Sequence, residues 1–160
     1  MRGVKSLPNV WRPGGGRSYA GPLLIDTHVW IWYLDGVGER MSDEGVALVR
    51  RSVQEEGVVV SDISVWEVGM KTAKGKLSLF PTANAWIERA SRRPGFSFLP
   101  LDREILLAST QLPGAVHGDP ADRMLIASSA LSGIPFATVD PLIIAYSEAR
   151  GGLSVCDLRR

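Results

Sequence analysis

Five acidic residues of this chain stand where a buried strand would end or where the next helix would begin. Asp26 follows the apolar run LLI, Glu67 comes a few residues after VVV, and Asp140 follows FATV. Asp119 and Asp122 stand near the start of another helical stretch. In an open parallel sheet the carboxyl ends of the strands lie along one edge, where ligands bind. Carboxylates that are distant in the sequence can therefore converge at that edge.

Helix capping is the alternative explanation for each of these acids taken singly. Aspartate is a favoured N-cap and proline is favoured at the first helical position, and both Asp119 and Asp140 precede a proline. Ser64 and Glu67 have the spacing of a capping box, and Asp26 could cap a helix that begins at the next residue. Ser, Thr or Asn would cap a helix equally well, so the repeated use of a carboxylate favours a second role.

Binding of a hard divalent cation is that second role. Several carboxylates in one place stay ionised only if a cation holds them or if their pKa values rise. Oxygen ligands select Mg²⁺ or Mn²⁺, and the sequence has no paired His or Cys spacing that would indicate zinc. Mg²⁺ held by a few acids and several waters suits phosphate chemistry. The chain has neither a Gly-x-Ser-x-Gly elbow nor a phosphate-binding Gly-rich loop, so we expect water to hydrolyse a phosphodiester.

The elements that must position these acids alternate along the chain from Pro22 onward. Short apolar runs alternate with stretches of helical spacing, which is typical of an α/β fold with a parallel sheet covered by helices on both faces. The expected strands are 23–25, 58–60, 96–99, 135–139 and 153–155. The expected helices are 27–34, 42–55, 64–74, 82–93, 102–110, 120–131 and 141–147.

Length and composition fit one domain. A chain of 160 residues with 45% hydrophobic content can fill a single core, which we expect over residues 22–160. Residues 1–21 contain Pro and Gly without an apolar period, which predicts a disordered leader. No segment has the apolar length of a signal peptide or a membrane span, and the lone Cys156 excludes a disulfide framework. We therefore expect a soluble cytoplasmic protein without a membrane partner. The net charge of +1 does not decide whether nucleic acid is bound.

Three blocks of the sequence resemble the PIN domains of VapC-type toxins. These blocks are LLIDTHVWIWYL, VSDISVWEVGMKTAKGKLSL and HGDPADRMLIASSALSGIPFATVD, and the resemblance runs from about Leu23 to Leu158. It implies a three-layer α/β/α sandwich whose central parallel sheet has the order 3-2-1-4-5. It also implies a ribonuclease that depends on Mg²⁺ or Mn²⁺, acts as the toxin of a toxin-antitoxin pair, forms a homodimer and is neutralised by a VapB-type antitoxin.

Mapped onto matching positions, the resemblance assigns the acids of the site to Asp26, Glu67, Asp122 and Asp140. We expect Asp26 and Asp122 to lead metal binding, Asp140 to complete it directly or through water, and Glu67 to position the attacking water or a second metal. Asp119 assists or caps the helix, and either Asp119 or Asp122 could be the closer ligand. The sequence does not name the RNA or the antitoxin.

Several interpretations stay open at this stage. Thr138 could orient the acids by a hydroxyl hydrogen bond or bond only locally. Lys71 and neighbouring basic residues could hold RNA phosphates or simply form a solvated surface. A signalling receiver also gathers acids at a sheet edge, but here Asp26 is followed by Thr27 instead of the second acid that such a site needs. The main alternative to the nuclease is a PIN-like scaffold that binds RNA or protein without cutting.

Overall fold

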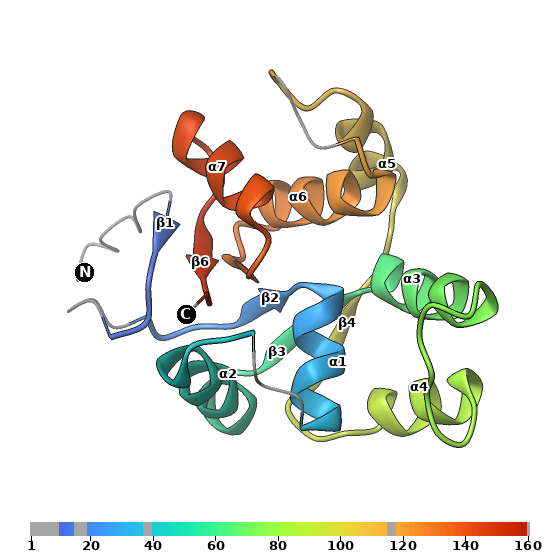
Figure 1. The fold of residues 1–160 in the computed structure, drawn as a ribbon. Helices are drawn as coiled ribbons and strands as arrows, with labels where there is room; N and C mark the ends of the chain where they lie inside the picture. Colours follow the sequence, from blue (N-terminus) through green and yellow to red (C-terminus); the bar gives the residue numbers. More distant parts are fainter. Residues whose placement is uncertain (1–9, 15–18, 37–39, 115–117, 160) are drawn as a thin grey trace.

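The computed structural model describes residues 10–14, 19–36, 40–114 and 118–159 of the chain (Figure 1). Helices and strands alternate along most of this length. In chain order the elements are β1 (Val10–Trp11), β2 (Leu23–Ile25), α1 (Thr27–Asp35), α2 (Asp43–Glu55), β3 (Val58–Ser61), α3 (Asp62–Ala73), α4 (Ala83–Ser91), β4 (Phe96–Leu99), α5 (Arg103–Thr110), α6 (Pro120–Ser132), β5 (Phe136–Thr138), α7 (Pro141–Ala149) and β6 (Val155–Asp157).

The described strands form one six-stranded sheet in the order β1-β6-β5-β2-β3-β4, and each neighbouring pair is parallel. The five strands that the sequence predicts, counted in chain order, have the order 3-2-1-4-5, so this prediction is confirmed. The chain first builds the sheet outward from β2 through β3 to β4 and then returns to the other side of β2 with β5. The strand order therefore reverses at β2, where open parallel sheets bind their ligands.

Alternating side chains divide the core into two parts, one on each face of the sheet. Leu23 and Ile25 of β2 belong to the cluster that includes buried side chains of α1, α2 and α4. Leu24, between them, belongs to the cluster built with α6 and α7. In Figure 1 these two groups of helices lie on opposite sides of the sheet. This is the period-two burial of a strand covered on both faces, and it confirms the α/β sandwich.

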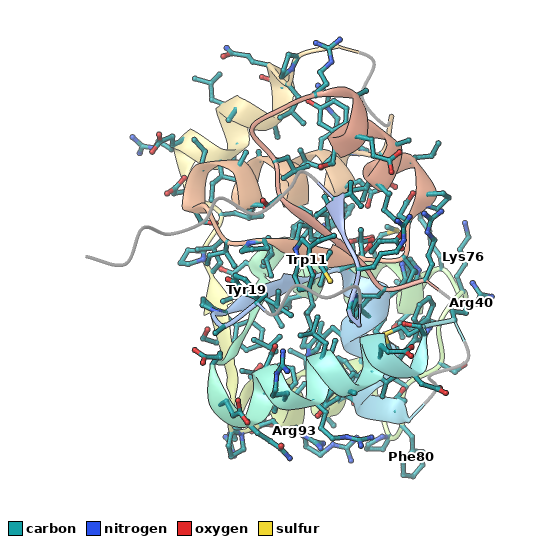
Figure 2. All side chains as sticks on the ribbon, turned by 90° about the vertical axis from the view of Figure 1, so that its left-hand side faces the viewer. Trp11, Tyr19, Arg40, Lys76, Phe80 and Arg93 are labelled. Atoms are coloured by element: carbon teal, nitrogen blue, oxygen red, sulfur yellow. The ribbon has the colours of Figure 1, made fainter. Side chains whose placement is uncertain are left out.

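The first strand lies inside the segment that the sequence predicts to be a disordered leader. Val10 and Trp11 pair in parallel with β6, and Trp11 is buried against the ring of Tyr19, with the ring centroids 5.6 Å apart (Figure 2). A two-residue strand therefore lies within the segment expected to be disordered, and one large indole buried at the sheet edge stabilises it although it is too short to show a period. Residues 1–9 and 15–18 of the expected leader lie outside the described residues.

The observed boundaries lie within two residues of the predicted ones, and the starts of β6 and α3 each differ by two. β6 begins at Val155, two residues after the expected start, because Phe136 of β5 pairs with Val155. α3 begins at Asp62, because Ser61 ends the strand and its hydroxyl accepts a hydrogen bond from the amide of Ile63 at 3.3 Å. None of the helices among the described residues is both long and apolar enough to cross a membrane.

Candidate active site

The five predicted acids lie along one cleft at the carboxyl edge of the sheet. Asp26 follows β2 and Asp140 comes two residues after β5, and these two strands are neighbours. Glu67 lies on α3, and Asp119 and Asp122 lie at the start of α6. The cleft has a volume of about 520 Å³ and is lined by all five of these residues. The convergence inferred from the strand ends is thus present in the structure, and the role of each acid remains a prediction.

Asp26 is held by a hydrogen bond from the neighbouring strand. Its side chain is buried, and Oδ2 accepts a hydrogen bond of 2.6 Å from the hydroxyl of Thr138 on β5. The same hydroxyl accepts a hydrogen bond of 3.0 Å from the amide of Asp140. Asp26 precedes α1 but makes no side-chain capping bond, so helix capping does not explain this carboxylate. The orienting hydrogen bond expected from Thr138 is confirmed.

Burial raises the pKa of the Asp26 carboxyl above its ordinary value, and the nearby charge of Asp140 raises it further. The hydrogen bond from Thr138 and the imidazole of His28 act in the opposite direction without cancelling the effect of burial. A cation beside this carboxylate would favour its ionised form.

Glu67 is fixed by α1 rather than by a capping box. Its Oε1 accepts a hydrogen bond of 2.6 Å from the hydroxyl of Thr27, which also lies 2.8 Å from the hydroxyl of Ser64. The Nζ of Lys71, one turn along α3, lies 3.5 Å from Oε2 of Glu67. The capping-box interpretation of Ser64 and Glu67 is wrong, because α3 starts at Asp62 and the carboxylate binds across to α1 instead. Thr27 was not singled out from the sequence, since nothing local marks a hydroxyl that bonds 40 residues away.

Asp119 and Asp140 cap helices and line the cleft at the same time. Oδ1 of Asp119 accepts a hydrogen bond of 2.8 Å from the amide of Ala121, and Oδ1 of Asp140 accepts one of 2.8 Å from the amide of Leu142. Each is followed by a proline at the first helical position. The capping interpretation is confirmed for these two acids. It does not exclude a second role, because both face the same cleft as Asp26.

The pKa of Asp122 is raised both by burial and by the negative charges of the other four acids of the cleft. Burial raises its pKa to about 8, with further contributions from the charges of Asp26, Asp119, Glu67 and Asp140. At neutral pH the acids therefore cannot all be ionised unless a cation offsets their repulsion. This is the electrostatic signature of a cluster with more negative charge than the protein alone neutralises.

A protein-family model for the PIN domain matches residues 23–148. The chain belongs to the PIN domain family. The match contains all five acids of the cleft. Comparison with curated proteins finds no match.

Solved structures with the same fold are similar to this PIN domain at low sequence identity. The structure of VapBC2 from Rickettsia felis, bound to a DNA fragment from its promoter, gives a TM-score of 0.60 at 9% identity and covers 84% of this chain and 96% of that one. FitAcB from Neisseria gonorrhoeae gives 0.56 at 20% identity, with coverages of 84% and 96%. VapBC-5 from Mycobacterium tuberculosis, a member of a family of toxin-antitoxin systems, gives 0.55 at 15% identity, with coverages of 88% and 100%.

The donor set of this PIN domain fits a hard divalent cation by its chemistry. Carboxylate oxygens are the ligands that Mg²⁺ and Mn²⁺ prefer, and the raised pKa of Asp122 marks the excess of negative charge that such an ion would neutralise. Within the described ranges, however, no three His, Cys, Asp or Glu side chains are grouped so that they could hold a metal ion. The acids therefore supply the right atoms without defining a coordination geometry.

The cleft of the PIN domain also contains basic and aromatic side chains. It is lined by His28, Trp32, Arg40, Lys71 and Arg159 in addition to the acids. Arg40 and Arg159 were not identified from the sequence, and no motif marks them. An isolated antiparallel bridge between Met41 and Arg159 brings these two segments together, so only the tertiary fold reveals that both face the cleft.

Asp157 is an acid at a strand end that does not join the cluster. It is buried at the end of β6, and its carboxylate binds the guanidinium of Arg159 through bonds of 2.9 and 2.8 Å. Arg12 lies 2.9 Å from the same carboxylate. Burial alone would raise the pKa of Asp157, but the hydrogen bonds and charge of Arg159, together with the charge of Arg12, hold it below its usual value. Asp157 thus also stands at the end of a buried strand, as Asp26 of the cleft does, but the charge of Asp157 is neutralised by Arg159 and Arg12.

Proposed function

We propose that this PIN domain is a ribonuclease that depends on Mg²⁺ or Mn²⁺ and hydrolyses RNA phosphodiester bonds. The observation that carries the proposal is the convergence of five carboxylates in one cleft, of which Asp26 makes no side-chain capping bond and Glu67 binds across to Thr27 instead of capping α3. Keeping such a cluster is costly in the absence of a cation, as the raised pKa of Asp122 indicates. The charge is accounted for if the cluster binds a divalent ion that acts on phosphate.

In this proposal Asp26, Asp122 and Asp140 hold the ion, and Asp119 assists them or serves only as a cap. When bound, a divalent ion supplies a more acidic water and neutralises charge that develops on the phosphate. Thr138 holds the carboxylate of Asp26 in one orientation through its 2.6 Å hydrogen bond. Glu67, held by Thr27, accepts a proton from the water that attacks phosphorus. The P–O ester bond breaks, and its oxygen leaves with a proton drawn from solvent.

We further propose that the biological role is that of a VapC-type toxin, which a VapB-type antitoxin neutralises and which acts as a homodimer. Support comes from the PIN family match and from solved relatives whose own descriptions name VapBC and toxin-antitoxin systems. These relatives are less than 25% identical to this chain and show the shared fold, so the toxin role and the antitoxin partner are proposed from their descriptions together with the resemblance of the sequence blocks to VapC-type toxins.

Cleavage of a labelled mixed RNA pool by the purified chain tests the nuclease directly. We expect cutting with Mg²⁺ or Mn²⁺ that EDTA stops and that Asp26→Asn abolishes, because the amide keeps the size of the side chain and removes its charge. Circular dichroism of the variant controls for folding. If the folded, metal-supplied wild type leaves all RNAs intact, the nuclease proposal fails.

One observation favours the alternative of a PIN scaffold that binds without cutting. No three acids among the described residues are grouped closely enough to hold an ion. A scaffold would bind RNA or protein and give no cleavage with any divalent ion, whereas the nuclease cuts with Mg²⁺ or Mn²⁺ and loses cleavage in EDTA or when a cleft acid is replaced. The same cleavage assay therefore separates these two functions.

A further inference from the structure

One part of the cleft is lined by the aromatic rings of Trp32 and His28 and by the basic side chains of Arg40 and Lys71. His28 and Trp32 stand four residues apart on α1, so they lie on one face of that helix. Arg40 comes from the segment before α2, and Lys71 comes from α3. All four line the same cleft as the acids. The structure thus brings these side chains from three segments to the place where the proposed chemistry occurs.

The side chains form a continuous series of contacts, in which the His28 and Trp32 rings are tilted relative to each other. The guanidinium carbon of Arg40 lies 5.5 Å from the ring centroid of Trp32, within the range of a cation–π interaction. The ring centroids of Trp32 and His28 are 5.6 Å apart with an interplanar angle of 41°. The Nζ of Lys71 lies 3.0 Å from Nε2 of His28. The series of contacts therefore runs Arg40, Trp32, His28, Lys71.

Core packing accounts for only part of this arrangement, because Trp32 contacts the core cluster that contains Trp30 but is only partly buried. Trp30, on the same helix, is fully buried and packs edge-on against Trp86 and Phe98. Trp32 is only partly buried and His28 and Arg40 are exposed, so water or a ligand reaches them. A partly exposed indole forgoes some of the hydrophobic stabilisation that Trp30 obtains. The exposed part of the Trp32 ring can instead contact a ligand in the cleft.

We propose that Trp32 and Arg40 bind an unpaired base of the RNA next to the phosphate that is cleaved. This inference rests on the nuclease function proposed above. Base stacking on an aromatic ring or on a guanidinium plane is the usual way in which proteins hold unpaired nucleotides, and it tolerates any base sequence. In a duplex the faces of the bases are covered by their neighbours, so a paired base cannot reach the ring.

Charge in the cleft supports the same occupant. The five acids repel the phosphates of a nucleic acid. Arg40, Lys71 and Arg159 line the same cleft and add positive charge to it, although Lys71 also pairs with Glu67 and Arg159 with Asp157. The carboxylate of Asp157 fixes the guanidinium of Arg159 by two hydrogen bonds. A stacking surface flanked by cations is what a strand with one phosphate per nucleotide requires.

Binding to a form that does not cut isolates this step from catalysis. Asp26→Asn in the full-length chain is titrated against a fluorescein-labelled single-stranded RNA hexamer and against a blunt RNA duplex, and fluorescence anisotropy is measured. We expect Trp32→Ala in this background to weaken binding of the hexamer about tenfold. Trp32→Phe retains most of the affinity because it keeps a ring. Trp66→Ala is the matched control, because Trp66 is 56% exposed on α3 and does not line the cleft.

The salt dependence of RNA binding by Arg40→Gln is a second test, because this dependence would not change if Arg40 had a purely structural role. We expect Arg40→Gln to lower the slope of log affinity against log salt by about one, whereas Arg50→Gln, an exposed arginine of α2, leaves the slope unchanged. In cleavage by the otherwise wild-type chain, Trp32→Ala raises KM about tenfold with kcat close to that of the wild type.

The outcomes separate this inference from the proposed function. Equal binding by the folded Trp32→Ala and Trp66→Ala proteins, equal binding of duplex and hexamer, or no binding of any RNA overturns the stacking subsite. If the wild type does not cut but Trp32→Ala still weakens hexamer binding, the nuclease proposal fails and the subsite stands. If the wild type cuts and Trp32→Ala leaves KM unchanged, the subsite fails and the nuclease stands.

Discussion

Protonation of Asp122 makes the stability of the metal-free protein depend on pH, and Asp122→Asn removes this dependence. Burial, and then the charges of nearby acids, raises the pKa of Asp122 from 3.8 to about 8. Between these values the folded protein keeps a proton that the unfolded chain has lost. The unfolded chain therefore binds fewer protons, and the free energy of unfolding falls as the pH rises through this range. Below about pH 4 both states are protonated, and the stabilisation is complete.

The size of the effect follows from the pKa difference and the exposure of the side chain. A shift from 3.8 to about 8 corresponds to about 5 to 6 kcal/mol for a group shielded from water. Asp122 is only partly buried, so solvent screening reduces this to about 2 to 3 kcal/mol. We expect wild-type stability to fall by about that amount between pH 5 and pH 9. With an ordinary urea dependence this moves the unfolding midpoint by about 1 to 2 M.

Urea denaturation followed by tryptophan fluorescence, in EDTA at pH 5, 7 and 9, measures the effect. The stability of Asp122→Asn relative to the wild type should increase with pH. Asp102→Asn is the control, because Asp102 also stands at a helix start, where it caps α5, but lies outside the cluster of acids. Addition of Mg²⁺ at pH 9 should restore stability to the wild type more than to Asp122→Asn. A constant difference between wild type and Asp122→Asn at all three pH values would refute the reasoning.

Two further predictions concern the support of the cleft and the edge of the sheet. Thr138→Val removes the hydroxyl that donates to the buried Asp26, so it should destabilise the fold by about 1 to 3 kcal/mol in urea; a loss no larger than that of Thr110→Val, whose hydroxyl bond is exposed, would contradict this. Trp11→Ala empties the buried contact of β1 and should cost about 3 kcal/mol, whereas the exposed Trp66→Ala should cost less than about 0.5 kcal/mol. Equal thermal midpoints for these two variants would show that β1 adds nothing to stability.

The sequence predicts the main sheet because its central strands are short apolar runs bounded by turn residues and acids. Leu23, Leu24 and Ile25 are all fully buried, as expected for a strand covered on both faces. Val10 and Trp11 offer two residues among Pro and Gly, which is too little for a period, and their pairing with β6 depends on a segment far along the chain. The local sequence pattern therefore predicts the strands that are buried in the core, and it misses the edge strand β1, which forms through its pairing with β6.

The acids of the cleft are predictable for a different reason from their partners. A parallel sheet places its strand ends along one edge, so Asp26 and Asp140 could be brought together from the pattern alone. The hydroxyl of Thr27 and the guanidinium of Arg159 reach the cleft through helix orientation and an isolated bridge, which no spacing rule contains. The capping box was a local alternative at Glu67, and the tertiary hydrogen bond from Thr27 prevailed over it.

The hydrogen bond between Thr138 and Asp26 joins residues that are 112 positions apart in the chain. Asp26 therefore leaves the ribosome long before its partner Thr138 is synthesised. Domains form as their segments emerge during synthesis, beginning from the N-terminus. β2, β3 and β4 can pair early, but β5 and the start of α6, which complete the cleft, come from the last third of the chain. The acids therefore meet only after the segment that contains α6 and β5 has been synthesised. If the proposed ribonuclease function is correct, a nascent chain cuts no RNA before these segments have come together.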